Sequence, residues 1–185
     1  VCKNIKEIST IVKKYKITVL SDEIYSELTF DKSYESISNF CPEKVIVSNG
    51  LSKWCGAGGW RLGYFIIPNE LNKIKNSMKV LASETFSSVS APIQFAAISA
   101  FKDDHKEYIL KSKKILKGIG EYIYNNLKSN NVIINKPMGG FYLMPEFLNK
   151  KFNTSAEMCT DLLNKKGVAI LPGSDFGFSV EKMIS

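Results

Sequence analysis

Residues 50–64 read GLSKWCGAGGWRLGY. The stretch holds one lysine, Lys53, and one arginine, Arg61, among glycines and other small residues. Most of the 25 Lys and Arg side chains in the chain are expected to be solvated surface charges. Lys53 and Arg61 differ because the small residues between them let the backbone approach a ligand closely. The stretch therefore predicts a ligand site that offers an amine and a guanidinium.

Length and composition predict an ordinary soluble globular protein. The chain has 185 residues, of which 44% are hydrophobic and 23% are charged, and this length suffices to bury a core. No apolar run approaches the roughly 20 residues that span a bilayer, so we expect no membrane partner. The chain begins at Val1 without a signal peptide, and we interpret it as a piece of a longer protein.

The net charge of +7 could indicate a nucleic acid or another anionic partner. The lysines, however, are spread along helical segments such as ILKSKKILKGIG (109–120) rather than clustered in one arm. No RRM, helix-turn-helix or zinc-finger pattern accompanies them. We therefore interpret the charge as a solvated face and expect no nucleic-acid partner.

The cysteines and the single histidine exclude several classes of site. Cys2, Cys41, Cys55 and Cys159 are scattered without a C-x-x-C pair, which predicts free thiols in a reducing, cytoplasmic compartment. His105 lies in the polar stretch FKDDHKEY, and we interpret it as an exposed helix residue. With this single histidine we expect no metal site and no serine or cysteine hydrolase.

The first part of the chain alternates between helix and strand patterns. Apolar residues at helical spacing predict a helix over 3–15. Three short apolar runs follow, ITVL at 17–20, VIV at 45–47 and LGYFII at 62–67. Such β-branched runs are typical of strands buried on both faces. Because polar segments follow the strands, the pattern predicts an α/β sheet.

Three helices are predicted next. Asn69 is expected to cap the first, and Ser90 with Pro92 begins a second, Ala-rich helix. Asp103 and Asp104 open a third, long helix. The composition also changes near this point, where we place a domain boundary.

The remaining part predicts a small α+β arrangement. NVII (131–134) and GGFYLMPEF (139–147) predict two strands separated by a Pro-Met-Gly-Gly turn. Phe141 and Tyr142, which follow the glycines of this turn, are expected in the core.

One more helix and one more strand are predicted towards the end of the chain. Thr154 and Glu157 form a capping box for a helix that ends at Gly167. The run VAIL (168–171) then predicts a last strand before the segment PGSDFG.

Chemically distinctive side chains accompany the three predicted strands of the first part. Asp22 and Tyr25 follow the first strand, Lys53 follows the second, and Arg61 precedes the third. Ligands of open α/β sheets bind outside the carboxyl ends of the strands, so we expect these groups in one crevice. A lysine can form a Schiff base with an aldehyde, and a carboxylate can keep a pyridine nitrogen protonated. A phenol can donate a hydrogen bond to a ring oxygen, and arginine binds phosphate through two parallel bonds. Pyridoxal 5'-phosphate (PLP) needs all four groups, which makes it the expected cofactor.

These motifs resemble those of a known family. GLSKWCGAGGWRLGY resembles the active-site signature of class I/II (fold type I) PLP-dependent aminotransferases, in which Arg follows Lys by eight residues inside G-W-R-L-G. SDEIYSEL (21–28) is similar to the S/A-D-E-x-Y element of the same family. The resemblance extends over the whole chain, including GGFYLMPEF and LPGSDFG, and it matches the C-terminal half of such an enzyme.

The resemblance implies an α/β fold of the PLP-dependent transferase (aspartate aminotransferase-like) type. Residues 1–102 would form the C-terminal part of the PLP-binding large domain, with part of its sheet. Residues 103–185 would form the small C-terminal α+β domain.

The resemblance also implies a role for each distinctive side chain. Lys53 would be the catalytic residue, holding the cofactor as a Schiff base and moving a proton between the substrate Cα and the cofactor C4′. Asp22 would pair with the pyridinium nitrogen, and Tyr25 would donate a hydrogen bond to the O3′ oxygen. Arg61 would bind the phosphate.

Other parts of the family's site depart from this chain or lie outside it. Many relatives have Ser where this chain has Gly50, and Ser48 or Ser52 is the alternative hydroxyl partner for the phosphate. The resemblance places the phosphate-binding helix N-terminus and the ring-stacking aromatic residue before Val1. It places the arginine for the substrate carboxylate soon after Ser185. The implied assembly is a homodimer.

The implied activity is transfer of an amino group between an amino acid and a 2-oxo acid. A C–S β-lyase or a cyclopropane-carboxylate synthase of the same fold would share the same four side chains, since fold does not settle the reaction. A non-catalytic PLP-fold regulator is the remaining alternative. The preserved Lys53 argues against it, because binding alone does not require the Schiff base.

Overall fold

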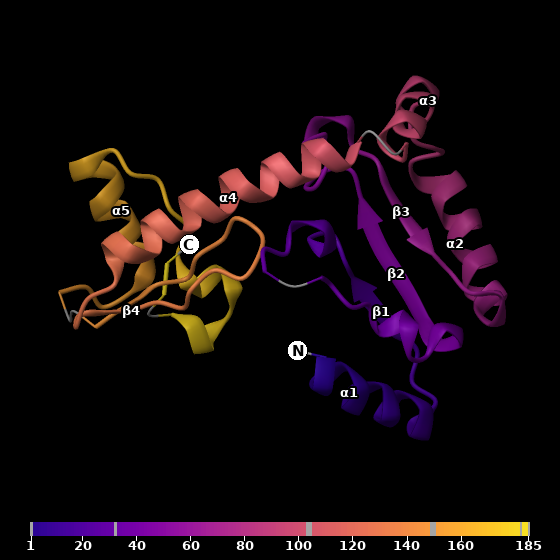
Figure 1. Cartoon of the computed structure of the whole chain (residues 1–185), viewed down its shortest axis with the longest axis horizontal. Helices are drawn as coiled ribbons and strands as arrows, with labels where there is room; N and C mark the ends of the chain where they lie inside the picture. The colour runs from indigo at the N-terminus through magenta and orange to yellow at the C-terminus, as the bar shows by residue number, and fades with distance from the viewer. Residues whose placement is uncertain (1, 32, 103–104, 149–150, 182, 185) are drawn as a thin grey trace. The chain divides into compact units, whose positions relative to one another are not determined.

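The computed structural model describes residues 2–31, 33–102, 105–148, 151–181 and 183–184. The chain divides into two compact units, residues 1–112 and residues 113–185. Figure 1 labels helices α1 to α5 and strands β1 to β4. The assignment of 1–102 to a large domain and 103–185 to a small domain stays a prediction.

A three-stranded sheet organises the first unit (Figure 1). It comprises β1 (Val19–Asp22), β2 (Val45–Gly50) and β3 (Gly63–Ile66). β1 pairs parallel with β2, and β2 pairs antiparallel with β3. All three strands were expected from the apolar runs, although β1 begins and ends two residues later than the run ITVL.

The core of this unit lies on one face of the sheet. Helix α1 (Cys2–Tyr15) confirms the predicted first helix. Because Val19 and Val45 are register partners and side chains alternate along a strand, these residues share a face with Val47. The strand residues pack there with a residue of α1 and two from the segment before β2, and the cluster contains Val12, Ile37, Cys41, Val45 and Val47. Burial of this cluster fixes one face of the sheet against the helix.

Three further helices follow the sheet: α2 (Asn72–Thr85), α3 (Ala91–Ala100) and α4 (His105–Leu127). The cap predicted at Asn69 is wrong. Residues Asn69–Leu71 form a 3-10 turn, and Leu71 precedes α2 without a side-chain cap. Pro92 lies in the first turn of α3 as expected, because that turn does not need its missing N–H. Asp103 and Asp104 lie outside the described residues.

The second unit contains a two-stranded antiparallel sheet and helix α5 (Ser155–Lys166). The predicted capping box is confirmed at its N-terminus, where the Glu157 amide donates to Thr154 Oγ1 at 3.1 Å. At its C-terminus Gly167 takes the left-handed conformation with φ +67°, which glycine adopts without a steric penalty.

Three strand or core predictions for this unit are wrong. The strands are short, β4 (Val132–Ile133) and β5 (Glu146–Phe147), so most of GGFYLMPEF is not strand. The run VAIL forms no strand, and the chain continues from it into a 3-10 turn at Gly173–Phe176. Phe141 and Tyr142 are exposed, at 47% and 51%, and their rings contact each other with centroids 4.8 Å apart.

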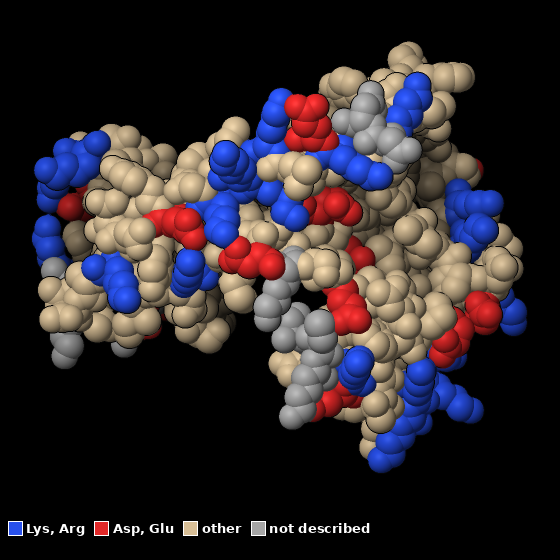
Figure 2. Space-filling view, viewed as in Figure 1, with Lys and Arg blue, Asp and Glu red and all other residues tan. Residues whose placement is uncertain are grey.

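The described surface carries both signs of charge. Figure 2 shows Lys and Arg side chains interspersed with Asp and Glu over the visible face. Within the described part of the chain, no helix is long and apolar enough to cross a membrane. No cluster of three or more His, Cys, Asp or Glu suitable for a metal ion occurs there either. Cys41, Cys55 and Cys159 are free thiols, and burial raises the pKa of each.

Candidate active site

Strand register brings the four predicted site residues to one edge of the sheet. β1 ends at Asp22, which pairs with Ser48, two residues before β2 ends at Gly50. Gly50 pairs with Gly63, the first residue of the antiparallel β3. The segments after β1 and β2 and the segment before β3 therefore meet at the same edge. These segments carry the four predicted residues Asp22, Tyr25, Lys53 and Arg61.

A tight turn follows β1 and carries Asp22 and Tyr25. The Ile24 amide donates to Asp22 Oδ1 at 3.3 Å, an Asx-type turn that the short aspartate side chain favours. The Leu28 amide donates to the Tyr25 carbonyl at 2.9 Å, which begins a 3-10 turn over Ser26–Leu28. The Asp22 side chain is exposed and that of Tyr25 is half-buried.

The loop after β2 holds Lys53 between two buried residues. Leu51 is fully buried and Trp54 is 5% exposed. The Trp54 ring contacts the rings of Phe101 and His105, with centroids 5.8 Å apart in each pair. His105 begins α4 and is thus a helix residue as expected, but it is half-buried against an aromatic ring rather than exposed. These anchors on both sides restrict the backbone of Lys53.

The amino group of Lys53 lies over the ring of Tyr25. Lys53 Nζ is 5.6 Å from the ring centroid, within the distance at which an ammonium interacts with the face of an aromatic ring. The structure therefore brings together two of the residues that the sequence singled out, from two different loops.

Gly50 permits the close approach of β3. A Cβ built on Gly50 would lie 2.9 Å from the Leu62 carbonyl oxygen and 3.1 Å from the Gly63 Cα. Both are backbone atoms, which cannot rotate away as a side chain can. Glycine is therefore required at this position for the edge of the sheet to close as it does.

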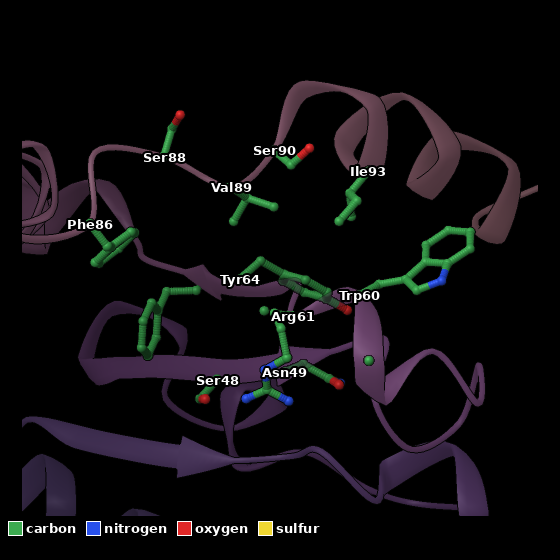
Figure 3. A pocket seen from close by; sticks show the side chains of 13 residues that line it. Ser48, Asn49, Trp60, Arg61, Tyr64, Phe86, Ser88, Val89, Ser90 and Ile93 are labelled. Atoms are coloured by element: carbon green, nitrogen blue, oxygen red, sulfur yellow. The ribbon is translucent and has the colours of Figure 1, made fainter.

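Arg61 lines a cavity of about 520 Å³ at the same edge. In Figure 3 its side chain is seen with Ser48 and Asn49 on one side of the cavity, and Val89 and Ile93 lie on the other side. Arg61 Nη1 donates to the Gly58 carbonyl at 3.0 Å. Lys53 does not belong to the residues that line this cavity.

The backbone of Arg61 is itself unusual. Its φ is +54°. This left-handed conformation is energetically unfavourable for any residue that has a Cβ atom. The surrounding structure maintains this strain, and such outliers often lie at functional sites. Lys16 (φ +54°) and Ser87 (φ +63°) share this conformation, so the backbone alone does not set Arg61 apart from other exposed residues.

Asn49 and Tyr64 are two cavity residues that the sequence reasoning missed. They are register partners on β2 and β3, and both line the cavity with Arg61. Asn49 Oδ1 accepts from the Gly50 amide at 2.7 Å. Burial, with a contribution from Glu27 and Glu23, raises the pKa of Tyr64. Their signal in the sequence is weak, because an Asn at a strand end and a Tyr in an apolar run are both common.

The donor set at this edge fits pyridoxal phosphate. An amine, a phenol, a carboxylate and a guanidinium lie on adjoining loops. Of these four groups, the Arg61 guanidinium alone lines the cavity of about 520 Å³, which is of the size that binds small molecules. The backbone approach at Gly50 leaves no space there for a side chain.

Comparisons with known proteins identify the family of this chain. The family model for aminotransferase class I and II matches residues 2–183. A probable N-acetyl-LL-diaminopimelate aminotransferase of Bacillus subtilis (strain 168) is 36% identical over 173 residues, which cover 93% of this chain and 42% of that protein.

Solved structures show the same fold. An alanine aminotransferase from Pyrococcus furiosus is 33% identical with a TM-score of 0.86, over 98% of this chain and 47% of that chain. An aromatic aminotransferase from Pyrococcus horikoshii OT3 is 27% identical with a TM-score of 0.90, over 98% of this chain and 49% of that one. The predicted aspartate aminotransferase-like α/β fold is confirmed.

This chain spans about half the length of the curated relatives and solved structures that it matches. The family match nevertheless runs across nearly all of the chain and includes both signature stretches. The chain belongs to the family of class I and II aminotransferases.

Proposed function

We propose that this protein, in its full-length form, is a PLP-dependent enzyme that transfers an amino group between an amino acid and a 2-oxo acid. The observation that carries the proposal is the Lys53 amino group, 5.6 Å from the centre of the Tyr25 ring, at the sheet edge where β1 and β2 end. Membership of the aminotransferase family supports the same reaction class.

Each of the four side chains has a defined task in this proposal. Lys53 would hold the cofactor covalently through Nζ until the substrate amine displaces it, and the freed amine would then take up the proton from the substrate Cα and return it later. Asp22 keeps a proton on the ring nitrogen. Tyr25 donates its hydroxyl proton in a hydrogen bond to the ring oxygen, and Arg61 holds the phosphate dianion.

PLP, when bound, supplies an electron sink for the charge that develops at the substrate Cα. The protein residues supply the orientation. Ser48 lines the Arg61 cavity, which favours it over Ser52 as the hydroxyl that meets the phosphate. The apolar Val89 and Ile93 lie on the opposite wall of the cavity.

The substrate is proposed only as a class. The similar proteins are named for alanine, for aromatic amino acids and for N-acetyl-LL-diaminopimelate. A shared α-amino acid and 2-oxo acid core is common to these reactions. We further propose a homodimer, and a cytoplasmic location on the basis of the scattered free thiols.

Absorbance of the full-length protein loaded with PLP tests the proposal. We expect a visible band in the wild type that Lys53→Ala abolishes and that Lys73→Ala, a change at an exposed lysine of α2, leaves intact. An identical band in Lys53→Ala would contradict the assignment of Lys53.

Product analysis tests the reaction itself. Transfer forms a new 2-oxo acid in proportion to the acceptor supplied. Formation of pyruvate and ammonia without an acceptor would instead indicate a β-lyase.

A further inference from the structure

Glu23 is a buried carboxylate directly next to Asp22. Glu23 is 7% exposed, whereas Asp22 is an exposed residue. Consecutive residues at the end of a strand point to opposite sides. Asp22 therefore points to one side and Glu23 into the interior behind it. A buried carboxylate is costly unless it is hydrogen-bonded.

Hydroxyl groups from two segments satisfy Glu23. Oε1 accepts from Ser21 Oγ at 3.0 Å and from Ser36 Oγ at 2.5 Å. Ser36 Oγ also shares a hydrogen bond with Ser38 Oγ at 2.7 Å and accepts from the Ser38 amide at 3.1 Å. We call Glu23, Ser21, Ser36 and Ser38 the Glu23 network. It joins the end of β1 to a segment 13 residues further along the chain.

The far end of the Glu23 network is fixed in the core. Ser36 is the N-cap of a 3-10 turn over Ile37–Asn39. Ile37, the first residue of that turn, is buried with Val12 of α1 and Val47 of β2. Ser36 thus offers its hydroxyl from a position that packing has already set.

The backbone of Glu23 is held as well. Its amide donates to the Ser48 carbonyl of β2 at 2.9 Å, and its carbonyl accepts from the Ser26 amide at 2.9 Å. The turn that contains Asp22 and Tyr25 is therefore held on the sheet side by Ser48 and on the interior side by the carboxylate. Tyr34 lies near the same carboxylate: burial, followed by the Glu23 charge, raises the pKa of Tyr34.

We propose that Glu23 is a positioning residue that, through Ser21 and Ser36, sets the turn bearing Asp22 and Tyr25 so that both meet the cofactor next to Lys53. This inference rests on the proposed function. In this proposal Glu23 contacts neither the cofactor nor the substrate. It acts only through the positions of Asp22 and Tyr25, which lie in the same turn.

The test compares paired variants of the full-length protein. Glu23→Gln removes the charge at nearly constant shape, and Ser36→Ala removes one donor while Ser36→Thr keeps it. Glu27→Gln, at an exposed glutamate of the same segment, is the matched control. For Glu23→Gln and Ser36→Ala we expect PLP affinity to fall about tenfold, since the first removes the charge from the acceptor of these hydrogen bonds and the second removes one of the bonds. Ser36→Thr and Glu27→Gln should bind PLP as the wild type does.

A spectroscopic readout separates positioning from a purely structural role. Because Asp22 and Tyr25 act on the cofactor ring, their displacement changes the pH midpoint of the absorbance of bound PLP. We expect a change of at least about 0.5 pH unit in Glu23→Gln. An unchanged midpoint, even with a lowered melting temperature, would overturn the inference and leave the proposed function intact.

A second readout does not depend on the cofactor. In the protein without PLP, hydrogen exchange of the peptide 21–28 should be faster in Glu23→Gln and Ser36→Ala than in Ser36→Thr. Equal exchange in all variants would overturn the inference. A wild type that fails to bind PLP would overturn the proposed function, and the positioning role with it, while faster exchange would still identify the network as the support of the turn.

Discussion

Lys53 Nζ lies 5.6 Å from the centroid of the Tyr25 ring, although the two residues are separated by a strand and two loops. The contact depends on the parallel pairing of β1 with β2, which places the turn after one strand beside the loop after the other. The ring face offers the ammonium group a favourable electrostatic contact. The Tyr25 hydroxyl is a separate group with a separate proposed task.

These two contributions of Tyr25 can be separated by substitution. Tyr25→Phe keeps the ring and loses the hydroxyl, and we expect PLP to bind about five- to tenfold more weakly, since one hydrogen bond contributes about 1 kcal/mol. Tyr25→Leu also loses the ring, which costs roughly a further 0.5–1 kcal/mol. Equilibrium titration with PLP measures the affinity of both variants. Tyr122→Phe, at an exposed tyrosine, is the control. Wild-type affinity in Tyr25→Phe would show that the hydroxyl does not act on the cofactor.

Gly50 yields a stability prediction with an internal control. A Cβ at Gly50 meets the backbone of Leu62 and Gly63, whereas a Cβ at Gly59 meets nothing within 4 Å. We expect Gly50→Ala to lower the free energy of unfolding by about 1–3 kcal/mol because the backbone of β3 must move. Gly59→Ala should stay within about 0.5 kcal/mol of the wild type. Urea denaturation checks the pair, and equal stabilities would refute the steric argument.

The sequence predicted the parts of the fold that depend on local pattern. Helix α1 and α5 follow from apolar spacing and from the capping box at Thr154. The strands of the first sheet follow from short apolar runs, but the expected burial on both faces is wrong for β1 and β3, where Leu20, Phe65 and Ile66 are exposed. The gathering of Asp22, Tyr25, Lys53 and Arg61 at one edge follows from the alternation of strands and loops.

Other features depend on contacts that no local pattern reveals. VAIL has the composition of a strand, yet it lacks a partner strand among the described residues, and pairing rather than propensity decides. His105 looks polar in sequence, but Trp54, which comes from the loop after β2, brings its ring against the imidazole. The same holds for Glu23, whose donor Ser36 lies 13 residues away.

The ion pair at the end of α5 predicts a pH dependence of stability. The hydrogen bond from Lys165, and secondly its charge, lower the pKa of Asp161 below its ordinary value. A lowered pKa in the folded state means that the stabilisation is fully present above the ordinary pKa of aspartate. It is lost as the pH falls through the lowered value.

We therefore expect Lys165→Met to have a lower free energy of unfolding than the wild type at pH 7. This difference in unfolding free energy should disappear in strong acid. Lys166→Met removes the same charge from the same helix turn and is the matched control, since both lysines lie in the last turn of α5 and interact with the helix dipole. Urea denaturation at several pH values measures the gap. A gap of the same size for both variants at every pH would assign the effect to the dipole and not to Asp161.

Gly173 yields the strongest stability prediction of the second unit. A Cβ there would overlap the carbonyl oxygens of Val180 and Met183, and the Gly173 amide donates to the same Met183 carbonyl at 2.8 Å. Gly173→Ala must therefore open the fold-back of the chain between these residues. We expect a loss of about 3 kcal/mol or more, as for other substitutions that overpack a buried site. Thermal unfolding and limited proteolysis around residues 173–181 check it.

Gly118→Ala is the control: it lies in α4 with nothing within 4 Å of the added Cβ, and it should stabilise the protein by about 0.5–1 kcal/mol, because alanine is the better helix former. A Gly173→Ala protein with the melting temperature of the wild type would contradict the close backbone contact on which this prediction rests.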